Sequence, residues 1–151
     1  MAPTIRPARP NESDAIANVF LHSWKTLMPD IPIGHTDDQV RAWIAKSVMV
    51  QKRVFVATEN DAVIAMMAIS EDGEGGWIDH LYVAPESVGR GVGTALLEHA
   101  LAILRAPVWL YAFQSNERAR EFYEARGFSV AKFGDGTGNQ VGLPDVLYRL
   151  D

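Results

Sequence analysis

Three glycines fall within six residues of the segment VGRGVGTALL, residues 88–97, just before an apolar run. Glycine destabilises helix and strand interiors by roughly 0.5–1 kcal/mol relative to alanine, so this cluster indicates a backbone that must turn or be approached closely. The first amides of a helix lack partners within the helix, and the helix dipole adds partial positive charge there. A glycine loop that opens a helix can therefore hold an anion, and a phosphate or diphosphate is the natural ligand.

Three phosphate-binding patterns can be compared with this loop. The dinucleotide fingerprint G-x-G-x-x-G fails because Thr94 stands where the third glycine is required. A P-loop needs Gly-Lys-Ser/Thr, which the chain lacks. The third pattern, Gln/Arg-x-x-Gly-x-Gly/Ala, binds the diphosphate of an acyl-CoA, and VGRGVG matches it at Gly91 and Gly93. Val88 replaces the leading polar residue of that pattern, and Arg90 within the loop could add positive charge.

A second segment, NERAREFYEARGF at residues 116–128, carries an amide and a phenol at helical spacing. Asn116 and Tyr123 are seven residues apart, about two helical turns, so they project on roughly the same side. Each also has a purely structural interpretation. Asn116 stands at a helix start and could be an N-cap, and Tyr123 could pack in the core beside Phe122.

The composition restricts the class of protein. The chain has 151 residues, which fits one domain over residues 1–151, and a net charge of −5, which gives no electrostatic footprint for nucleic acid. There is no cysteine, so disulfides, zinc–thiolate sites and a cysteine nucleophile are excluded. No secretory signal is evident, and no apolar run approaches the roughly 20 residues of a membrane span. We expect a soluble, cytoplasmic domain with no membrane partner.

The elements that position these residues alternate along the chain. Apolar spacing predicts a helix from Asn11 to Trp24 and another opened by a capping box at Thr36 and Gln39. RVFVAT and AVIAMMAIS read as a hairpin, followed by the strand WIDHLYVA and a helix from about Thr94 to Leu104. PVWLYAF reads as a fully buried strand, and FSVAKF and DVLYRL as a last hairpin after a helix from about Asn116 to Arg126. With TIRPA as a short first strand, the predicted order is β-α-α-β-β-β-α-β-α-β-β.

The two motifs together resemble the GNAT acetyltransferase superfamily. IDHLYVAPESVGRGVGTALL is similar to its motif A, and NERAREFYEARGF is similar to its motif B. The resemblance implies a single α/β domain with a mixed, mostly antiparallel sheet of about six or seven strands and about four helices. It also implies an N-acetyltransferase that uses acetyl-CoA as co-substrate, without a metal.

The resemblance assigns roles to residues of this chain. Tyr123 would protonate the leaving thiolate, and Asn116 would contact the pantetheine arm or an ordered water. The strand before the loop separates from its neighbour in this fold, which would free backbone groups to hold the pantetheine and polarise the acetyl carbonyl. The expected cofactor-binding residues are Leu81, Tyr82, Val83, Gly89, Arg90, Gly91, Val92, Gly93, Thr94 and Asn116.

The general base stays open between Asp79, His80 and a water relay. Simple alternation puts Asp79 on one strand face with Leu81 and Val83, and His80 on the other. The family also has a bulge in this strand, which would break the alternation. His80 has the better-suited unperturbed pKa, near 6.5. Asp79 stands at the family's usual side of the strand and is the first candidate.

The acceptor is an amine whose identity the sequence does not give. A small molecule or a peptide amine would attack directly in a ternary complex, because no cysteine can form an acyl-enzyme. The N-terminal helices and the loop GDGTGNQVG are expected to line its pocket, with Trp24, Trp43, Asp30, Asp37, Asp38, Asp135, Asn139 and Asp145 as candidate contacts. Two rival functions are a non-catalytic acyl-CoA-binding regulatory domain and a plain interaction module. An exposed strand edge after the last hairpin could pair two subunits as a homodimer.

Overall fold

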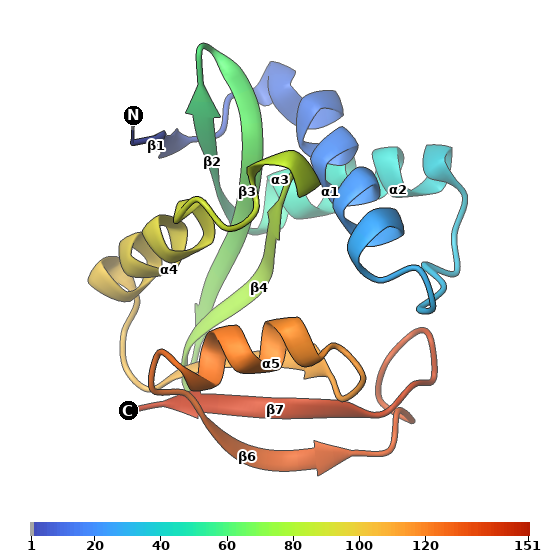
Figure 1. The fold of residues 1–151 in the computed structure, drawn as a ribbon, viewed down its shortest axis with the longest axis vertical. Coiled ribbons are helices and arrows are strands. Elements are labelled where there is room, and N and C mark those ends of the chain that lie inside the picture. The colour runs from blue at the N-terminus through green and yellow to red at the C-terminus, as the bar shows by residue number, and fades with distance from the viewer. Residues whose placement is uncertain (1) are drawn as a thin grey trace.

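The computed structural model describes residues 2–151, which form a seven-stranded sheet with helices on both faces (Figure 1). The strands are β1 (Thr4–Pro7), β2 (Arg53–Glu59), β3 (Ala62–Asp72), β4 (Gly75–Val83), β5 (Val108–Phe113), β6 (Ser129–Gly134) and β7 (Asp145–Leu150). The helices are α1 (Ser13–Leu27), α2 (Asp37–Trp43), α3 (Met49–Gln51), α4 (Val92–Ile103) and α5 (Glu117–Glu124). Residues 37–51 are continuously helical, with a π-helical middle at Ile44–Val48. This architecture confirms the predicted fold class.

The strand order is β1-β2-β3-β4-β5-β7-β6, and only the β4–β5 pair is parallel. The mostly antiparallel sheet expected from the sequence is therefore confirmed. The β2–β3 hairpin turns through Asn60 and Asp61, whose φ angles of 52° and 65° are the left-handed values that a two-residue hairpin turn requires.

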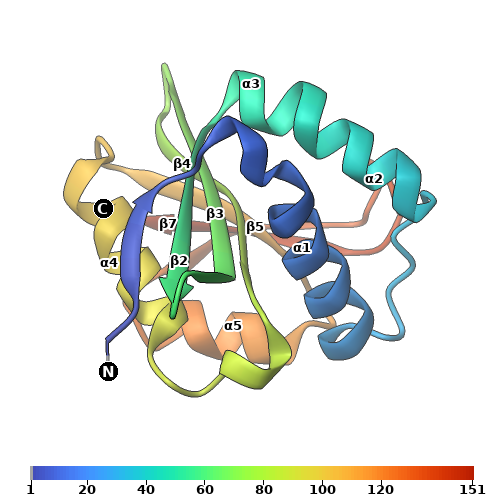
Figure 2. The same ribbon diagram turned by 90° about the horizontal axis from the view of Figure 1, so that it is seen from above.

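Helices lie on both faces of the sheet (Figure 2), and a hydrophobic core lies between the sheet and the helices on each face. Helices α1 and α2 cover one face of β2–β4 around Ile16, Phe20 and Ile44. Helices α4 and α5 cover the other face, where Leu96 and Tyr148 are fully buried. The sheet thus holds α4 and α5 side by side, which brings both sequence motifs to one face.

Several element boundaries differ from the predicted ones. The first helix begins at Ser13, after a 3-10 turn at Pro10–Glu12, because the proline at its start favours the tighter turn. Helix α4 begins at Val92, two residues before the predicted start, and α5 ends at Glu124. The predicted capping box is confirmed, since Thr36 Oγ1 accepts from the Gln39 amide at 3.1 Å.

The prediction that β5 is buried on both faces is wrong. Tyr111 in the middle of this strand is 60% exposed, whereas the neighbouring Leu110 is 2% exposed. Helices cover the Leu110 side of the strand along its length, whereas on the Tyr111 side α1 reaches only the end of the strand, where Trp24 contacts Phe113. An aromatic run therefore gave the same sequence signal as a doubly buried strand, because Trp and Tyr contribute apolar surface on an open face as well.

Among residues 2–151, no helix combines the length and apolar character needed to cross a lipid bilayer.

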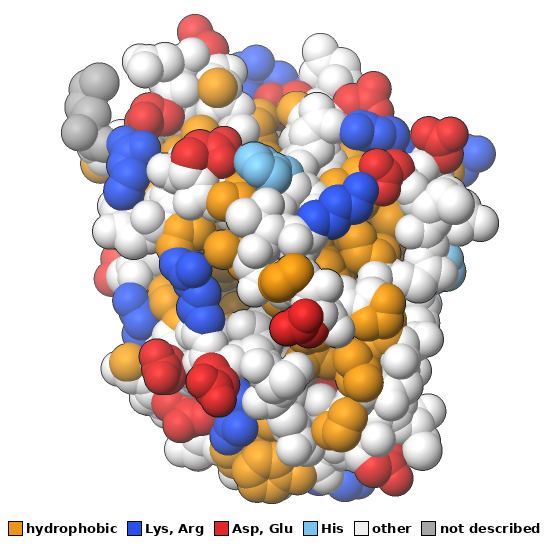
Figure 3. Space-filling view, turned by 45° about the vertical axis from the view of Figure 1, so that its right-hand side comes forward, with side chains coloured by type: hydrophobic (Ala, Val, Ile, Leu, Met, Phe, Trp, Pro, Cys, Tyr) orange, Lys and Arg blue, Asp and Glu red, His pale blue; other side chains and the backbone are white. Residues whose placement is uncertain are grey.

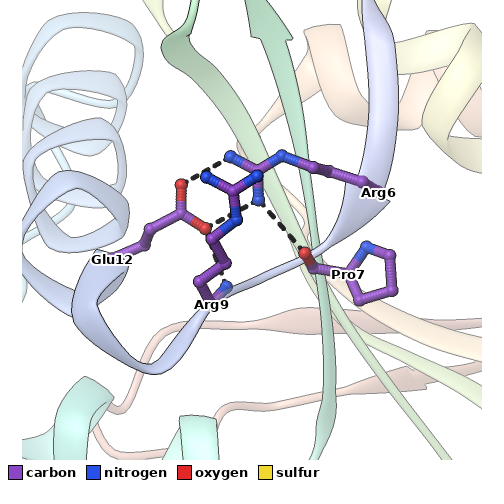
Figure 4. A network of polar contacts seen from close by, with 4 residues as sticks. All are labelled: Arg6, Pro7, Arg9 and Glu12. Atoms are coloured by element: carbon purple, nitrogen blue, oxygen red, sulfur yellow. Dashed lines mark hydrogen bonds and ion pairs between the residues drawn. The ribbon is translucent and has the colours of Figure 1, made fainter.

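An ion pair fastens the edge strand β1 to the start of α1 (Figure 4). Both guanidinium nitrogens of Arg6 donate to the Glu12 carboxylate, at 2.8 and 2.7 Å, and the Arg9 amide donates to it at 2.7 Å. The Arg6 bond, followed by the Arg9 amide, lowers the pKa of Glu12 from 4.5 to about 2, although partial burial opposes the shift. The carboxylate is therefore charged in the folded chain at any ordinary pH.

We expect Glu12→Gln to lower the free energy of unfolding at pH 7 by about 1–3 kcal/mol, because it removes charge-assisted hydrogen bonds. The folded-state pKa lies below the unfolded value, so this stabilisation is complete above about pH 4.5 and is lost as the pH falls toward 2. Thermal unfolding of both proteins from pH 7 to pH 2 should show their difference shrinking in that window. Glu98→Gln, an exposed carboxylate on α4, is the matched control. A difference that is constant with pH would contradict the assignment.

Candidate active site

Strand β4 begins against the segment that leads into β5. The Gly76 amide donates to the Arg105 carbonyl at 2.8 Å, and a Cβ on Gly76 would lie 2.9 Å from that same oxygen. Only glycine permits this approach without a shift of the backbone. The two strands pair at Gly76–Val108 and Trp77–Trp109, and beyond that point they separate. The expected gap between parallel neighbours is therefore present.

A β-bulge interrupts β4 at Asp79. Ala68 of β3 pairs with His80, and Ile69 pairs with Ile78, which leaves Asp79 as the extra residue. The bulge implied by the family resemblance is confirmed. It places consecutive side chains, Asp79 and His80, toward the same part of the molecule.

The Asp79 carboxylate accepts a hydrogen bond from Ser70 Oγ at 2.6 Å and lies 3.5 Å from Lys52 Nζ. Leu81 and Val83 pack instead against the core beneath α4. The prediction from simple alternation that Asp79 shares their face is therefore wrong, and the bulge is the physical reason.

His80 lies in an aromatic cluster on the α1 side of the sheet. Its ring centroid is 5.2 Å from that of Trp43 and 6.1 Å from that of Phe20. Burial lowers the pKa of His80 from 6.5 to about 4; the Asp79 charge opposes this shift and Lys52 adds to it. The imidazole is neutral near pH 7, so it can accept or donate a hydrogen bond without carrying charge.

The glycine loop turns through left-handed backbone at two of its three glycines. Gly89 and Gly91 have φ angles of 81° and 84°, and no atom lies within 4 Å of a Cβ built on either one. Gly91 is the N-cap of α4, and no side chain caps this helix. The first amides of α4 are therefore free to bind a ligand.

A smaller cavity of about 420 Å³ runs from this loop along the gap in the sheet. The side chains and backbone that line it come from the end of α1, β4, the loop, α4 and the segment around α5. They include Leu81, Tyr82, Val83, Val88, Gly89, Gly91, Gly93, Thr94, Asn116, Arg118, Ala119, Phe122, Tyr123 and Arg126.

A larger cavity of about 770 Å³ opens on the other side of the gap, toward the β6–β7 loop. It contains the carboxylates of Asp79, Asp135 and Asp145 and one cation, Lys132. Six residues line both cavities, so the two spaces meet at them: Met28, Leu81, Tyr82, Asn116, Ala119 and Tyr123. Over the face shown in Figure 3, acidic and basic side chains are interspersed with hydrophobic ones.

Tyr123 lies where the cavities meet and is 8% exposed. Its ring packs edge-on against Phe122 and Phe128, as the core interpretation predicted. Its hydroxyl has no hydrogen-bond partner among the described residues, and burial raises the pKa of the phenol well above 10. The phenol is therefore protonated and available as a donor to a ligand.

Asn116 is the N-cap of α5, as one interpretation of the sequence predicted. Its Oδ1 accepts from the Ala119 amide at 3.2 Å. Its Nδ2 points to the Met28 sulfur at 3.2 Å, a weak acceptor that a ligand could replace. Capping thus uses only one end of the amide.

Several predicted contacts do not reach either cavity. The Arg90 guanidinium pairs with Glu59 at 2.7 Å outside the cavity, and the Val92 side chain is buried in the core. The proposed acceptor contacts Asp135, Asn139 and Asp145 do line the larger cavity, but five others do not: Trp24, Trp43, Asp30, Asp37 and Asp38.

Arg126, which the sequence analysis did not single out, lines the smaller cavity. Its Nη2 donates to Thr94 Oγ1 at 2.6 Å, beside the glycine loop. The sequence feature that could have indicated Arg126 is its spacing of four residues, about one helical turn, from Phe122 of the second motif.

No cluster of three or more His, Asp or Glu side chains that could hold a metal ion occurs within residues 2–151.

Comparison with known proteins places these features in context. The acetyltransferase (GNAT) family profile matches residues 18–128. Peptidyl-lysine N-acetyltransferase YiaC of Escherichia coli K12 is 28% identical over 127 residues, covering 83% of each chain. Peptidyl-lysine N-acetyltransferase YjaB of the same strain is 32% identical over 109 residues, covering 71% of this chain and 69% of YjaB.

Solved structures share the fold. The solution structure of apo YjaB from Escherichia coli superimposes with a TM-score of 0.79 at 22% identity, covering 99% of this chain and 97% of that one. The PaiA N-acetyltransferase from Thermoplasma acidophilum, solved in complex with coenzyme A, gives a TM-score of 0.76 at 18% identity, covering 99% of this chain and 100% of that one.

The partly buried position of His80 in the aromatic cluster predicts an unusual titration. In the folded protein its imidazole should protonate with a midpoint near pH 4, as followed by NMR, and in urea near pH 6.5. Because the unfolded chain binds this proton more readily, stability should rise with pH between about 4 and 6.5 and be complete above that range. A midpoint near 6.5 in the folded protein would mean that water reaches the ring.

Proposed function

The chain belongs to the GNAT acetyltransferase family and is an N-acetyltransferase, and we propose that it moves the acetyl group of acetyl-CoA to a primary amine by direct attack in a ternary complex. The observation that carries the proposal is the meeting of two cavities at Tyr123. One cavity begins at an anion-binding glycine loop, and the other carries acidic side chains.

The smaller cavity fits acetyl-CoA, which supplies the acetyl group as a thioester. The free amides at the start of α4 and the open space over Gly89 and Gly91 suit a diphosphate. The gap beside β4 exposes backbone near Leu81 and Val83 to the pantetheine arm and the acetyl carbonyl. The PaiA N-acetyltransferase, which shares this fold, was solved in complex with coenzyme A, and this supports a coenzyme A thioester as the ligand.

Proton transfers then follow from the chain's own residues. A primary ammonium has a pKa near 10 and must lose a proton before its nitrogen can attack. Asp79, in the larger cavity, accepts that proton directly or through water, and His80 is the alternative acceptor. As the new C–N bond forms and the C–S bond breaks, the Tyr123 phenol donates its proton to the departing sulfur. The nitrogen then gives up its second proton, which restores the phenol through water.

The acceptor that fits best is the ε-amine of a lysine in a peptide. YiaC and YjaB are named peptidyl-lysine N-acetyltransferases. The larger cavity has three carboxylates and one lysine in its lining, and Lys52 outside the lining pairs with Asp79, which leaves the carboxylates in excess by one. A net negative cavity attracts an ammonium group. Tyr111, 60% exposed beside Asp79, offers an aromatic face to the apolar part of a lysine side chain.

Ligand-dependent unfolding followed by a thiol-release assay tests the function. At about 100 times Kd, acetyl-CoA or CoA should add roughly 2.7 kcal/mol and raise the Tm by about 5–10 °C, whereas ATP should not. Thiol release should then require both acetyl-CoA and a lysine peptide. Binding without transfer to any amine would favour a regulatory acyl-CoA-binding domain, and no shift with either ligand would exclude acetyl-CoA.

Two single variants separate the proposed proton transfers. Tyr123→Phe should lower kcat at least about tenfold with little change in the Kd of acetyl-CoA, because the ring is kept and only the hydroxyl is lost. Asp79→Asn should also lower kcat, because an amide cannot accept the proton of the ammonium group. An unchanged kcat in Tyr123→Phe would exclude Tyr123 as the acid, and an unchanged kcat in Asp79→Asn would assign the base to His80 or water.

A further inference from the structure

The diphosphate site lacks the charged side chain that its sequence pattern usually supplies. Val88, which lines the smaller cavity, stands at the start of the loop where the pattern has Gln or Arg. Arg90, the only cation within the loop, is held by Glu59 outside the cavity. Backbone amides alone would then face two phosphate groups.

Arg126 lies just beyond the end of α5, and its guanidinium reaches the start of α4 beside the glycine loop. Its Nη2 donates to Thr94 Oγ1 at 2.6 Å, and Thr94 belongs to the first turn of α4. Its Nη1 donates to the Phe122 carbonyl at 2.9 Å, and its charged carbon lies 3.9 Å from the centroid of the Phe122 ring. These contacts fix the side chain before any ligand arrives.

The charge of Arg126 is not neutralised. Within residues 2–151, no carboxylate comes close enough to form an ion pair with it. Its Nε–H is buried and has no hydrogen-bond partner among those same residues. A partly buried cation with an unused donor is costly unless an anion completes it.

The Phe122 ring links Arg126 to the start of α4. A Cβ on Gly93, in the first turn of α4, would lie 3.5 Å from this ring, which is van der Waals contact. Phe122 in turn carries the Arg126 guanidinium on its face. The ring therefore lies between the first turn of the helix and the cation.

We propose that Arg126 binds the diphosphate of acetyl-CoA and so replaces the polar side chain that is absent at position 88. The proposal rests on the proposed function, since it assumes that acetyl-CoA is the ligand of the smaller cavity. The guanidinium donates to a phosphate oxygen from the α5 side, opposite the amides of α4, so the diphosphate is held between two sources of positive charge.

The test measures binding by calorimetry with CoA and with dephospho-CoA, which keeps the diphosphate but lacks the ribose phosphate. Arg126→Gln should raise both Kd values by the same factor, roughly 10- to 100-fold, as expected for the loss of charge-assisted bonds. Arg126→Lys keeps the charge and should recover part of the affinity. Lys46→Gln, an exposed cation in the π-helical segment, controls for net charge and should change Kd less than about twofold.

Each remaining outcome overturns the proposal in a distinct way. If Arg126→Gln binds both ligands as the wild type does, Arg126 has no part in binding and the proposed function stands. If the loss is confined to CoA, Arg126 holds the ribose phosphate. If Arg126→Lys binds as poorly as Arg126→Gln, packing on Phe122 is responsible rather than charge. If the wild type binds neither ligand, the proposed function fails as well.

Discussion

The separation of β4 from β5 is the constraint on which the candidate site depends. Gly76 fastens the beginning of β4 to the Arg105 carbonyl, and the strands pair for only two residues before they diverge. In the last pair, the indole rings of Trp77 and Trp109 stack with their centroids 5.9 Å apart, and this contact holds the two strands together where they still pair. Without this divergence, β4 would satisfy its backbone groups against β5 and no continuous space could join the two cavities.

Helices α4 and α5 supply the remaining walls of the smaller cavity, which begins at the gap between β4 and β5. The glycine loop turns the chain so that the N-terminus of α4 faces the gap. Helix α5, which carries the second sequence motif, lines the same cavity. Tyr123 needs both conditions, because its ring must be fixed in the core while its hydroxyl remains in the cavity. The low exposure that fixes the ring also keeps the phenol protonated.

The element order and the position of the glycine turn could be predicted from the sequence, because both depend on local patterns of residues. Apolar periodicity and turn residues were sufficient for the element order, and the glycine spacing located the turn before α4. The family resemblance added the sheet topology and the bulge in β4, neither of which follows from residue spacing. The cavity positions of Tyr123 and Asn116 agree with the roles implied for them, which remain predictions.

The remaining features depend on contacts between distant segments. Arg90 is kept outside the cavity by Glu59, 31 residues away, and Arg126 reaches Thr94 across 32 residues. Nothing in a local window distinguishes these two arginines. The open face of β5 at Tyr111 was missed for a similar reason, since burial depends on which helix covers a strand and not on the strand's own composition.

The division of the lining residues between the two cavities also determines which parts of the site can change in sequence independently of one another. Six residues serve both spaces, whereas the segment from Gly134 to Asn139 lines only the larger one. That segment connects β6 to β7 at the edge of the sheet, away from the glycine loop. Because loops tolerate insertions and exchanges, changes there can reshape the larger cavity and leave the residues that line the smaller one as they are.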